Sequence, residues 1–426
     1  MPSPGSLSLP PHPAHADTPR KPVRMRGTTV AVATSTGISF EITDDQKEFQ
    51  SLAHDFAKNE IRPIAAEADQ LSKLPIEVLR KGWESGLMNL HVPEEYGGAG
   101  LHSFDGVLIM EELAWGCSGI ATSMEANGLG AAPVIISGNE SQKAKYLGML
   151  TDEFKFSAFG LTEPGAGSDV SGIQTTATLS EDGTHYVLNG SKTFITNAEL
   201  ADWITIFAMT DKSAGHRGLT AFILDTKDAQ GNAMPGFTCE HHMDKLGQRA
   251  SPTNAIAFQD MIIPVENRLG EEGEGFKIAM KTLDATRPGV GAMATGVARS
   301  ALEYAMAYAV ERVQFGMPIA MNQGVNFLIA DMATNIEAAR LLTWRGAWLH
   351  DQGQRATLAS SHAKRFAADS CMSAATDAVQ IFGGYGYTKE YPVEKLMRDA
   401  KIFQIYEGTS QIQRLVIAKE LMMPRS

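Results

Sequence analysis

The sequence contains little cysteine, and its few cysteines are not arranged to hold a metal or to build a disulfide framework. Only three of the 426 residues are cysteine, Cys117, Cys239 and Cys371, and they form no Cys-x-x-Cys pair or cysteine–histidine ligand spacing. His241 and His242 are adjacent rather than at helical spacing, which does not favour a shared metal ion. We therefore expect three free thiols in the core, a reducing compartment and no metal site.

The sequence also lacks a long apolar run and a basic face. No stretch approaches the ~18–20 uninterrupted apolar residues that a membrane span requires. The formal net charge is −12, and the basic cluster of the sequence lies in the proline-rich N-terminus, at Arg20, Lys21, Arg24 and Arg26. Nucleic-acid backbones are bound by continuous basic surfaces. We expect neither a membrane span nor a nucleic-acid partner.

Residues 1–38 have no apolar periodicity. They contain seven prolines, four Lys/Arg and one acidic residue, Asp17, which predicts a disordered extension. The segment is poor in acids, as a mitochondrial transit peptide is, but its prolines oppose the amphipathic helix of such a peptide. An extended or mis-assigned start in a bacterial protein, with Met25 as another possible start, fits equally well. The expected location is the bacterial cytoplasm, with the mitochondrial matrix as the alternative.

The chain of 426 residues, 43% of them hydrophobic, is long and apolar enough to form two or three domains that act as one unit. Residues 39–154 have helical periodicity and predict an α domain. Its first helix begins at the capping box Thr43-Asp-Asp-Gln46. Phe49, Leu52, Ala53, Phe56 and Ala57 then recur at helical spacing, and Pro63 falls near the helix end. Further helices are expected at about 75–85, 103–115 and 141–150.

Residues 155–269 change to short β-rich runs and predict a small β domain. The runs begin at His185, Trp203, Leu219 and Asn254, and turn signals such as Glu181-Asp-Gly separate them. Residues 270–426 return to long helices with short connections, which favours a bundle. The residues expected to face its core are Val297, Ala301, Tyr304, Ala305 and Tyr308 in one helix and Phe327, Leu328, Met332, Ile336 and Ala339 in another. The fold class is therefore α+β.

Two motifs could bind a ligand. In the run from Asp399 to Gln411, Glu407 lies between Tyr406 and Gly408, and the glycine lets a ligand approach the backbone. Such a placement suits a carboxylate base, although a residue at a helix end is the alternative. Residues 159–169 are rich in glycine and small hydroxyl residues, whose exposed N–H groups could hold a phosphate. An ordinary turn is the alternative there.

Together with the segments 189–197 and 377–384, and in this order, these motifs resemble the acyl-CoA dehydrogenase family, most closely its medium-chain branch, from about Phe40 to about Glu420. The resemblance implies an N-terminal helical domain, a small central β domain and a C-terminal helical bundle. It also implies FAD, an acyl-CoA thioester as substrate, and removal of the α-proton as H⁺ and the β-hydrogen as hydride.

By the resemblance, Glu407 is the base, and its own backbone N–H is one donor to the thioester oxygen, with a flavin ribityl hydroxyl as the other. Hydrogen bonds to the thioester oxygen and exclusion of water would bring the pKa of the thioester α-proton and the pKa of Glu407 closer together. Some relatives place the base at the position of Thr286, so the threonine excludes that arrangement here. Glu125 would lie at the bottom of a deep, medium-chain acyl slot, with helix packing and a solvated carboxylate as the alternative.

The resemblance carries over further positions one by one. Thr162 would bond the pyrimidine side of the flavin, Thr196 would reach toward N5, and Phe194 stands where a stacked tryptophan is found. The implied cofactor residues are Phe159, Leu161, Thr162, Gly167, Ser168, Phe194, Ile195, Thr196, Thr409 and Gln411 in one subunit, and Arg312, Gln314, Phe315, Asn322, Gln323, Gln380, Gly383 and Gly384 from a neighbour. The implied substrate residues are Ser168, Asp284, Arg287, Glu125, Tyr406 and Gly408. A solvated or intramolecular ion pair is the alternative for Asp284 and Arg287.

The implied partners are an acyl-CoA, an electron-transfer flavoprotein that accepts the electrons, and identical subunits in a homotetramer built as a dimer of dimers. Two alternatives stay open. One is an acyl-CoA oxidase, which differs mainly in oxygen access, and the other is a catalytically silent structural flavoprotein. A decarboxylating dehydrogenase would need a cationic residue deep in the slot, and none is evident near Glu125.

Overall fold

The computed structural model describes residues 41–423, so the extension predicted for residues 1–38 lies outside the described residues. The first helix begins as expected. The Thr43 hydroxyl accepts the Gln46 N–H at 3.2 Å, and the Gln46 side chain accepts the Thr43 N–H at 3.0 Å. The N-terminal helices are α1 (Asp44–Phe56), α2 (Ala65–Leu71), α3 (Ile76–Glu84), α4 (Ser103–Ser137) and α5 (Glu140–Asp152).

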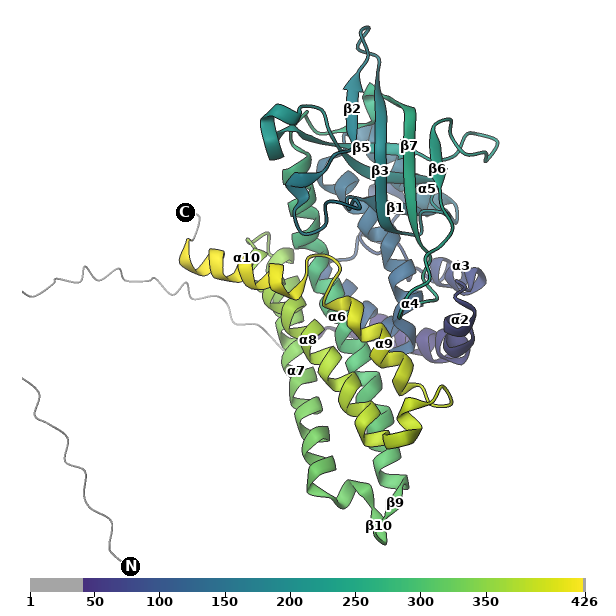
Figure 1. The fold of residues 1–426 in the computed structure, drawn as a ribbon, viewed down its shortest axis with the longest axis vertical. Helices are drawn as coiled ribbons and strands as arrows, with labels where there is room; N and C mark the ends of the chain where they lie inside the picture. Colours follow the sequence, from purple (N-terminus) through teal and green to yellow (C-terminus); the bar gives the residue numbers. More distant parts are fainter. Residues whose placement is uncertain (1–40, 424–426) are drawn as a thin grey trace, which may run out of the picture. The chain divides into compact units, whose positions relative to one another are not determined.

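Helix α4 is much longer than the expected 103–115. It continues to Ser137 across a break at Cys117, whose φ of −163° and ψ of 116° are not helical. The helix is buried on all sides, so its sequence shows no amphipathic period that would mark its full length. It runs from the N-terminal helices to the sheet and packs along α6 (Gly275–Glu311). It thereby connects the three parts of the fold (Figure 1).

The middle of the chain forms an eight-stranded sheet in the order β6-β7-β3-β2-β4-β5-β8, with β1 parallel to β4. All four expected strands are present, and sequence patterns missed the short strands β1, β2, β6 and β8. The strands are β1 (Ser157–Gly160), β2 (Thr176–Leu179), β3 (His185–Thr196), β4 (Trp203–Met209), β5 (Leu219–Asp225), β6 (Phe237–Cys239), β7 (Thr253–Pro264) and β8 (Arg268–Leu269). The pairing of β3 with β7 is irregular between Lys192 and Ile195, which marks a bulge.

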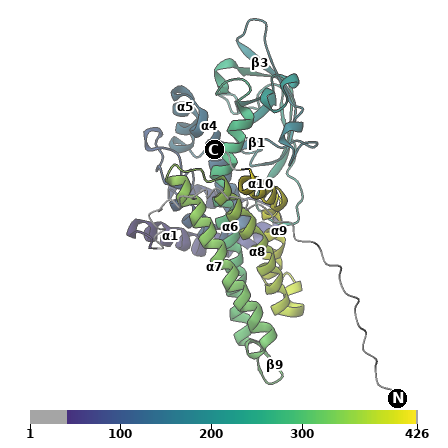
Figure 2. The same ribbon diagram turned by 90° about the vertical axis from the view of Figure 1, so that its left-hand side faces the viewer.

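The C-terminal part is the expected helical bundle. Its helices are α6 (Gly275–Glu311), α7 (Gln323–Asp351), α8 (Thr357–Phe382), α9 (Val393–Phe403) and α10 (Ser410–Met422), and a hairpin of β9 (Val313–Gln314) and β10 (Met317–Pro318) joins α6 to α7. The hairpin lies at the end of the bundle away from the sheet (Figure 2). Met332, Ile336 and Ala339 are buried as expected, but Phe327 is 61% exposed because it lies near this free end.

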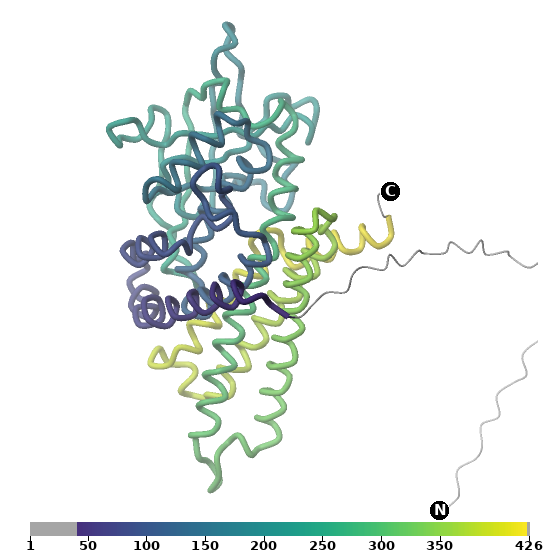
Figure 3. The backbone as a smooth tube through the Cα atoms, turned by 180° about the vertical axis from the view of Figure 1, so that it is seen from behind, coloured from purple at the N-terminus to yellow at the C-terminus, as the bar shows by residue number. Residues whose placement is uncertain are grey.

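Seen from behind, the purple N-terminal helices lie between the sheet and the free end of the bundle (Figure 3). All three cysteines are free, and Cys117 and Cys371 are buried, whereas Cys239 in β6 is partly exposed and does not belong to the core. Within residues 41–423, no helix is long and apolar enough to cross a membrane. The same range contains no group of three or more His, Cys, Asp or Glu placed to hold a metal ion.

Candidate active site

A cavity of about 340 Å³ lies where the sheet, α4, α6 and the turn between α9 and α10 meet. It brings together most of the residues that the sequence singled out, although they come from distant parts of the chain. The predicted residues on its wall are Glu125, Phe159, Leu161, Thr162, Gly167, Ser168, Phe194, Ile195, Thr196, Arg287, Tyr406, Glu407 and Gly408. Met280, Leu283, Val290 and Met293 of α6 add walls that the sequence did not predict.

The turn between α9 and α10 presents Glu407 to this cavity. Glu407 has a φ of +52° and Gly408 a φ of +89°, so two consecutive residues are left-handed. A non-glycine residue in this region costs about 1–3 kcal/mol and persists only where its surroundings hold it. The amide of Gln413 donates to the carbonyls of Glu407 at 3.3 Å and Gly408 at 3.0 Å, and the Lys364 ammonium donates to the Gly408 carbonyl at 2.7 Å.

The carboxylate of Glu407 accepts one hydrogen bond from a side chain. The Thr286 hydroxyl of α6 donates to Glu407 Oε2 at 2.9 Å. Burial raises the pKa of Glu407, and the bond from Thr286 and the charges of Lys364 and Arg287 oppose this shift. Sequence reasoning treated Thr286 only as a place where a base is missing. The structure shows it as the partner of the carboxylate.

Glu125 of α4 lies between two cavities. Its side chain also lines a second cavity of about 240 Å³ on the far side, whose wall includes Thr286 and Gly289 of α6. A Cβ at Gly289 would come 3.4 Å from Glu125 Oε1, so the glycine leaves room for the carboxyl group. Burial, and then repulsion from Glu407, raise the pKa of Glu125 to about 8. Glu125 is half-buried, and it lines both cavities.

Arg287 and Asp284 form the intramolecular ion pair that the sequence left open. Arg287 Nη1 lies 2.7 Å from Asp284 Oδ1, and Thr357 donates to Asp284 Oδ2 at 2.7 Å. Arg287 is 4% exposed and lines the cavity, whereas Asp284 does not. The Nε of Arg287 has no hydrogen-bond partner among the described residues.

A buried ion pair supports the glycine-rich loop that follows β1. Lys192 of β3 lies 2.8 Å from Glu163 Oε1 and also donates to the Leu161 carbonyl at 3.3 Å. A Cβ at Gly165 or Gly167 would meet nothing within 4 Å, so the loop faces open space. This geometry can accommodate an anion beside backbone N–H groups.

The bulge in β3 places an aromatic ring on the cavity wall. Phe194 has a φ of +59° and is 66% exposed, which is unusual for a large apolar side chain in a strand. The neighbouring Ile195 is buried. An exposed flat ring in a concave site offers a stacking surface for a planar ligand.

A second group of predicted residues lies away from Glu407, around the β9–β10 hairpin and the end of α8. Arg312, Gln314, Gly383 and Gly384 line a third cavity of about 460 Å³. Phe315 is 94% exposed. Asn322 and Gln323 begin α7, and Gln380 lies in the last turn of α8. None of these residues lines the first cavity within the described chain.

Thr409 and Gln411 follow Glu407 in sequence but do not line the first cavity. Thr409 caps α10, and its hydroxyl accepts the Ile412 N–H at 3.1 Å. Gln411 is exposed in the first turn of that helix.

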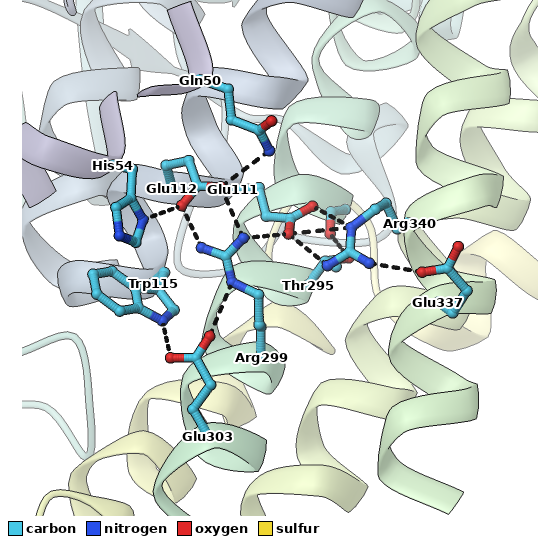
Figure 4. A network of polar contacts seen from close by, with 11 residues as sticks. Gln50, His54, Glu111, Glu112, Trp115, Thr295, Arg299, Glu303, Glu337 and Arg340 are labelled. Atoms are coloured by element: carbon cyan, nitrogen blue, oxygen red, sulfur yellow. Dashed lines mark hydrogen bonds and ion pairs between the residues drawn. The ribbon is translucent and has the colours of Figure 1, made fainter. Parts of the chain in front are cut away.

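A buried ion network fixes the helices that wall the site (Figure 4). Glu111 and Glu112 of α4 are each 3% exposed. Arg299 of α6 contacts both carboxylates, Arg340 of α7 lies 2.8 Å from Glu111, and His54 of α1 lies 2.8 Å from Glu112. Removing one partner of a buried ion pair lowers the free energy of unfolding by about 3–5 kcal/mol. We therefore attribute a structural role to this network, which ties α4 to α1, α6 and α7.

Three stretches of the chain match models of protein-family domains. Residues 43–153 match "Acyl-CoA dehydrogenase, N-terminal domain", residues 158–261 match "Acyl-CoA dehydrogenase, middle domain", and residues 273–422 match "Acyl-CoA dehydrogenase, C-terminal domain".

Curated relatives match over nearly their whole length. The short-chain specific acyl-CoA dehydrogenase of Clostridium acetobutylicum is 45% identical over 385 residues, which cover 90% of this chain and 100% of that protein. The probable medium-chain specific acyl-CoA dehydrogenase 2, mitochondrial, of Caenorhabditis briggsae is 42% identical over 388 residues, which cover 90% and 92%.

Solved structures agree with these matches. Butyryl-CoA dehydrogenase from Megasphaera elsdenii has a TM-score of 0.86 and 46% identity, with 90% of this chain and 100% of that chain covered. A chain in a structure described as the electron transferring flavoprotein of Acidaminococcus fermentans has a TM-score of 0.87 and 46% identity, with 91% and 100% covered. PigA with FAD and proline has a TM-score of 0.85 and 31% identity, with 90% and 99% covered.

Proposed function

Because the chain belongs to the acyl-CoA dehydrogenase family, we propose that it oxidises a straight-chain acyl-CoA of short to medium length to the trans-2-enoyl-CoA, with Glu407 as base and FAD as hydride acceptor. As a member of this family, the protein is an enzyme, an acyl-CoA dehydrogenase. The observation that carries the assignment of Glu407 is its place in a left-handed turn on the cavity wall, with Thr286 bound to its carboxylate.

Glu407 would take the α-proton of the thioester. A carboxylate in water is far too weak a base for this proton, but burial raises the pKa of Glu407 and so makes its anion more basic. Thr286 orients the carboxylate, and Gly408, whose φ of +89° suits glycine, follows Glu407 on the cavity wall. The backbone N–H of Glu407 would donate to the thioester oxygen, where negative charge develops as the proton leaves.

The residues on the cavity wall fit a flavin. Phe194 offers an exposed ring, and the open loop at Gly165 and Gly167 has space for a pyrophosphate beside backbone amides. Thr162 and Thr196 lie on the same wall and would bond the ring system. When bound there, FAD would supply the acceptor for the β-hydrogen. The structure of PigA with FAD at 31% identity supports this choice of flavin.

Glu125 would end the acyl slot. In the pH range below its raised pKa of about 8 its carboxyl is uncharged and can face an apolar chain end. The sequence suggested a medium-chain substrate, but similarity does not single out that length, since a short-chain relative is 45% identical and a medium-chain one 42%. We therefore propose a range from short to medium.

The remaining partners belong to the same proposal. Arg312, Gln314, Gly383 and Gly384 around the third cavity would contact the FAD of a neighbouring subunit in a homotetramer. Similarity to a chain in an electron transferring flavoprotein structure supports such a flavoprotein as the electron acceptor. The bacterial cytoplasm stays the expected location.

Turnover of a series of acyl-CoAs with an artificial acceptor tests the proposal. Butyryl-, hexanoyl- and octanoyl-CoA should be oxidised, with specificity falling toward longer chains because Glu125 closes the slot. Oxidation of only branched or dicarboxylic acyl-CoAs would contradict the straight-chain assignment, and no turnover with any acyl-CoA would contradict the reaction.

A further inference from the structure

Three lysines of the described chain are buried, and one of them has no carboxylate partner. Lys192 lies 2.8 Å from Glu163, and Lys395 lies 2.6 Å from Asp399. Lys364 of α8 is 0% exposed, yet no carboxylate within residues 41–423 comes within 4.0 Å of its Nζ. A buried ammonium without a paired anion is costly, so its position calls for an explanation.

The Lys364 ammonium is directed at the turn that carries the base. Its hydrogen bond goes to the Gly408 carbonyl at 2.7 Å, directly after Glu407. The carboxylate on its own helix, Asp369, is engaged by Gln404 at 2.9 Å, Ser410 at 2.8 Å and Arg414 at 2.6 Å. Two negative charges act on Lys364, and that of Glu407 has the larger effect and that of Asp369 the smaller.

Resting on the proposed function, we propose that Lys364 is a positioning residue for the base: its ammonium holds the left-handed Glu407–Gly408 turn and favours the ionised form of the Glu407 carboxylate. Glu407 must be ionised to take a proton, and its turn must be held against the strain of a positive φ. Lys364 would meet both needs without lining the cavity wall itself.

Other charged groups also lie near the Glu407 carboxylate and affect its ionisation. Arg287 approaches from α6 and favours the anion, although it is already paired with Asp284. The Glu125 carboxyl of α4 repels the Glu407 anion only when it is itself ionised, and its pKa is raised to about 8. Burial lowers the pKa of Lys364 to about 7, against the attraction of Glu407. The support from Lys364 is therefore strongest on the acid side of neutrality, where the ammonium is charged, and fades at alkaline pH.

Infrared titration of the resting holoenzyme tests the inference without turnover. The band of a protonated carboxyl group that disappears in Glu407→Gln reports Glu407 alone. We expect its titration midpoint to move to higher pH in Lys364→Met, which keeps the length of the side chain but removes charge and donor. Gln413→Met is the matched control, because Gln413 donates to the same turn without a charge. Its midpoint should stay at the wild-type value.

Anaerobic flavin reduction by acyl-CoA gives the second readout. The acid limb of the rate should move to higher pH in Lys364→Met, with roughly a tenfold loss per pH unit of displacement on that limb and convergence with wild type at alkaline pH. If Lys364→Met does not fold, Lys364→Gln should show the moved midpoint and Lys364→Arg should restore it. An unmoved midpoint in the neutral variants overturns the inference. Wild-type enzyme that no acyl-CoA reduces contradicts the proposed function instead.

Discussion

Replacing Glu125 with glutamine should make the protein more stable at alkaline pH and leave its stability in acid almost unchanged. The substitution keeps the size and hydrogen-bonding capacity of the side chain between the two cavities, but it cannot ionise. Burial raises the pKa of Glu125 from 4.5 to about 8, so the folded protein binds this proton more tightly than the unfolded chain does. A raised pKa of an acid adds stability below the unfolded value, which is lost as the pH rises toward the folded value.

The structure sets the size of this effect. Each pKa unit corresponds to about 1.4 kcal/mol. The shift of Glu125 can therefore lower the free energy of unfolding of wild type by at most about 5 kcal/mol between acid and alkaline pH. Glu125 lines a cavity on either side, and water in these cavities will screen its charge. We therefore expect a gain of the order of 2 kcal/mol for Glu125→Gln above pH 8 relative to its value in acid.

Urea unfolding of wild type and Glu125→Gln at about pH 5 and about pH 8.5 measures how the difference in their free energies of unfolding depends on pH. Between these two values the contribution of Glu125 to the stability of wild type only falls as the pH rises. Glu181→Gln, in an exposed turn of the sheet, is the matched control and should give the same difference at both values. In parallel, the KM of wild type for acyl-CoA should rise above pH 8, where a charge enters the acyl slot, and that of Glu125→Gln should not. A difference in unfolding free energy that is constant with pH would refute a buried, neutral Glu125.

Further expectations concern the base, the shared cofactor site and the electron acceptor. Thr286→Val should move the acid limb of flavin reduction to higher pH and slow it about tenfold or more near neutrality, because a hydrogen bond to a charged group is worth about 1.5–3 kcal/mol; an unchanged pH profile by stopped flow would speak against the bond. Arg312→Ala should lose FAD and should release it on dilution to monomer, whereas a monomer that keeps stoichiometric flavin would exclude a shared site. Reduced enzyme with product bound should pass electrons quickly to an electron-transfer flavoprotein and slowly to oxygen, and peroxide that accumulates in step with enoyl-CoA would identify an oxidase.

Local patterns predicted much of the fold. The capping box at Thr43 and the four longest strands were found because their signals lie within a few residues. Helix α4 was cut short at Trp115 because it is buried on all sides, so the contrast between its faces that marks a surface helix is absent. Phe327 was placed in the core by its spacing, but nothing in the described chain covers it at the free end of the bundle.

The site was predicted more completely through family motifs than through local chemistry. Glu407 and the loop at Gly167 belong to motifs with a fixed order along the chain. Thr286 and Lys364 gave no such signal, because their roles depend on contacts with Glu407 and Gly408 across 121 and 44 residues. A lysine in a helix is ordinarily a surface residue, and only the packed structure shows that this one is buried beside the Glu407–Gly408 turn.

Anaerobic flavin reduction in Glu407→Gln tests the central claim most directly. The amide keeps the shape of the side chain and can still bond Thr286, but it cannot accept the α-proton. We expect FAD content and acyl-CoA binding to stay intact while butyryl-CoA or octanoyl-CoA reduces the flavin several orders of magnitude more slowly, in line with the ~10²–10⁴-fold contribution of a positioned base. Reduction at a near-normal rate, in a variant that still binds both molecules, would remove Glu407 from the mechanism.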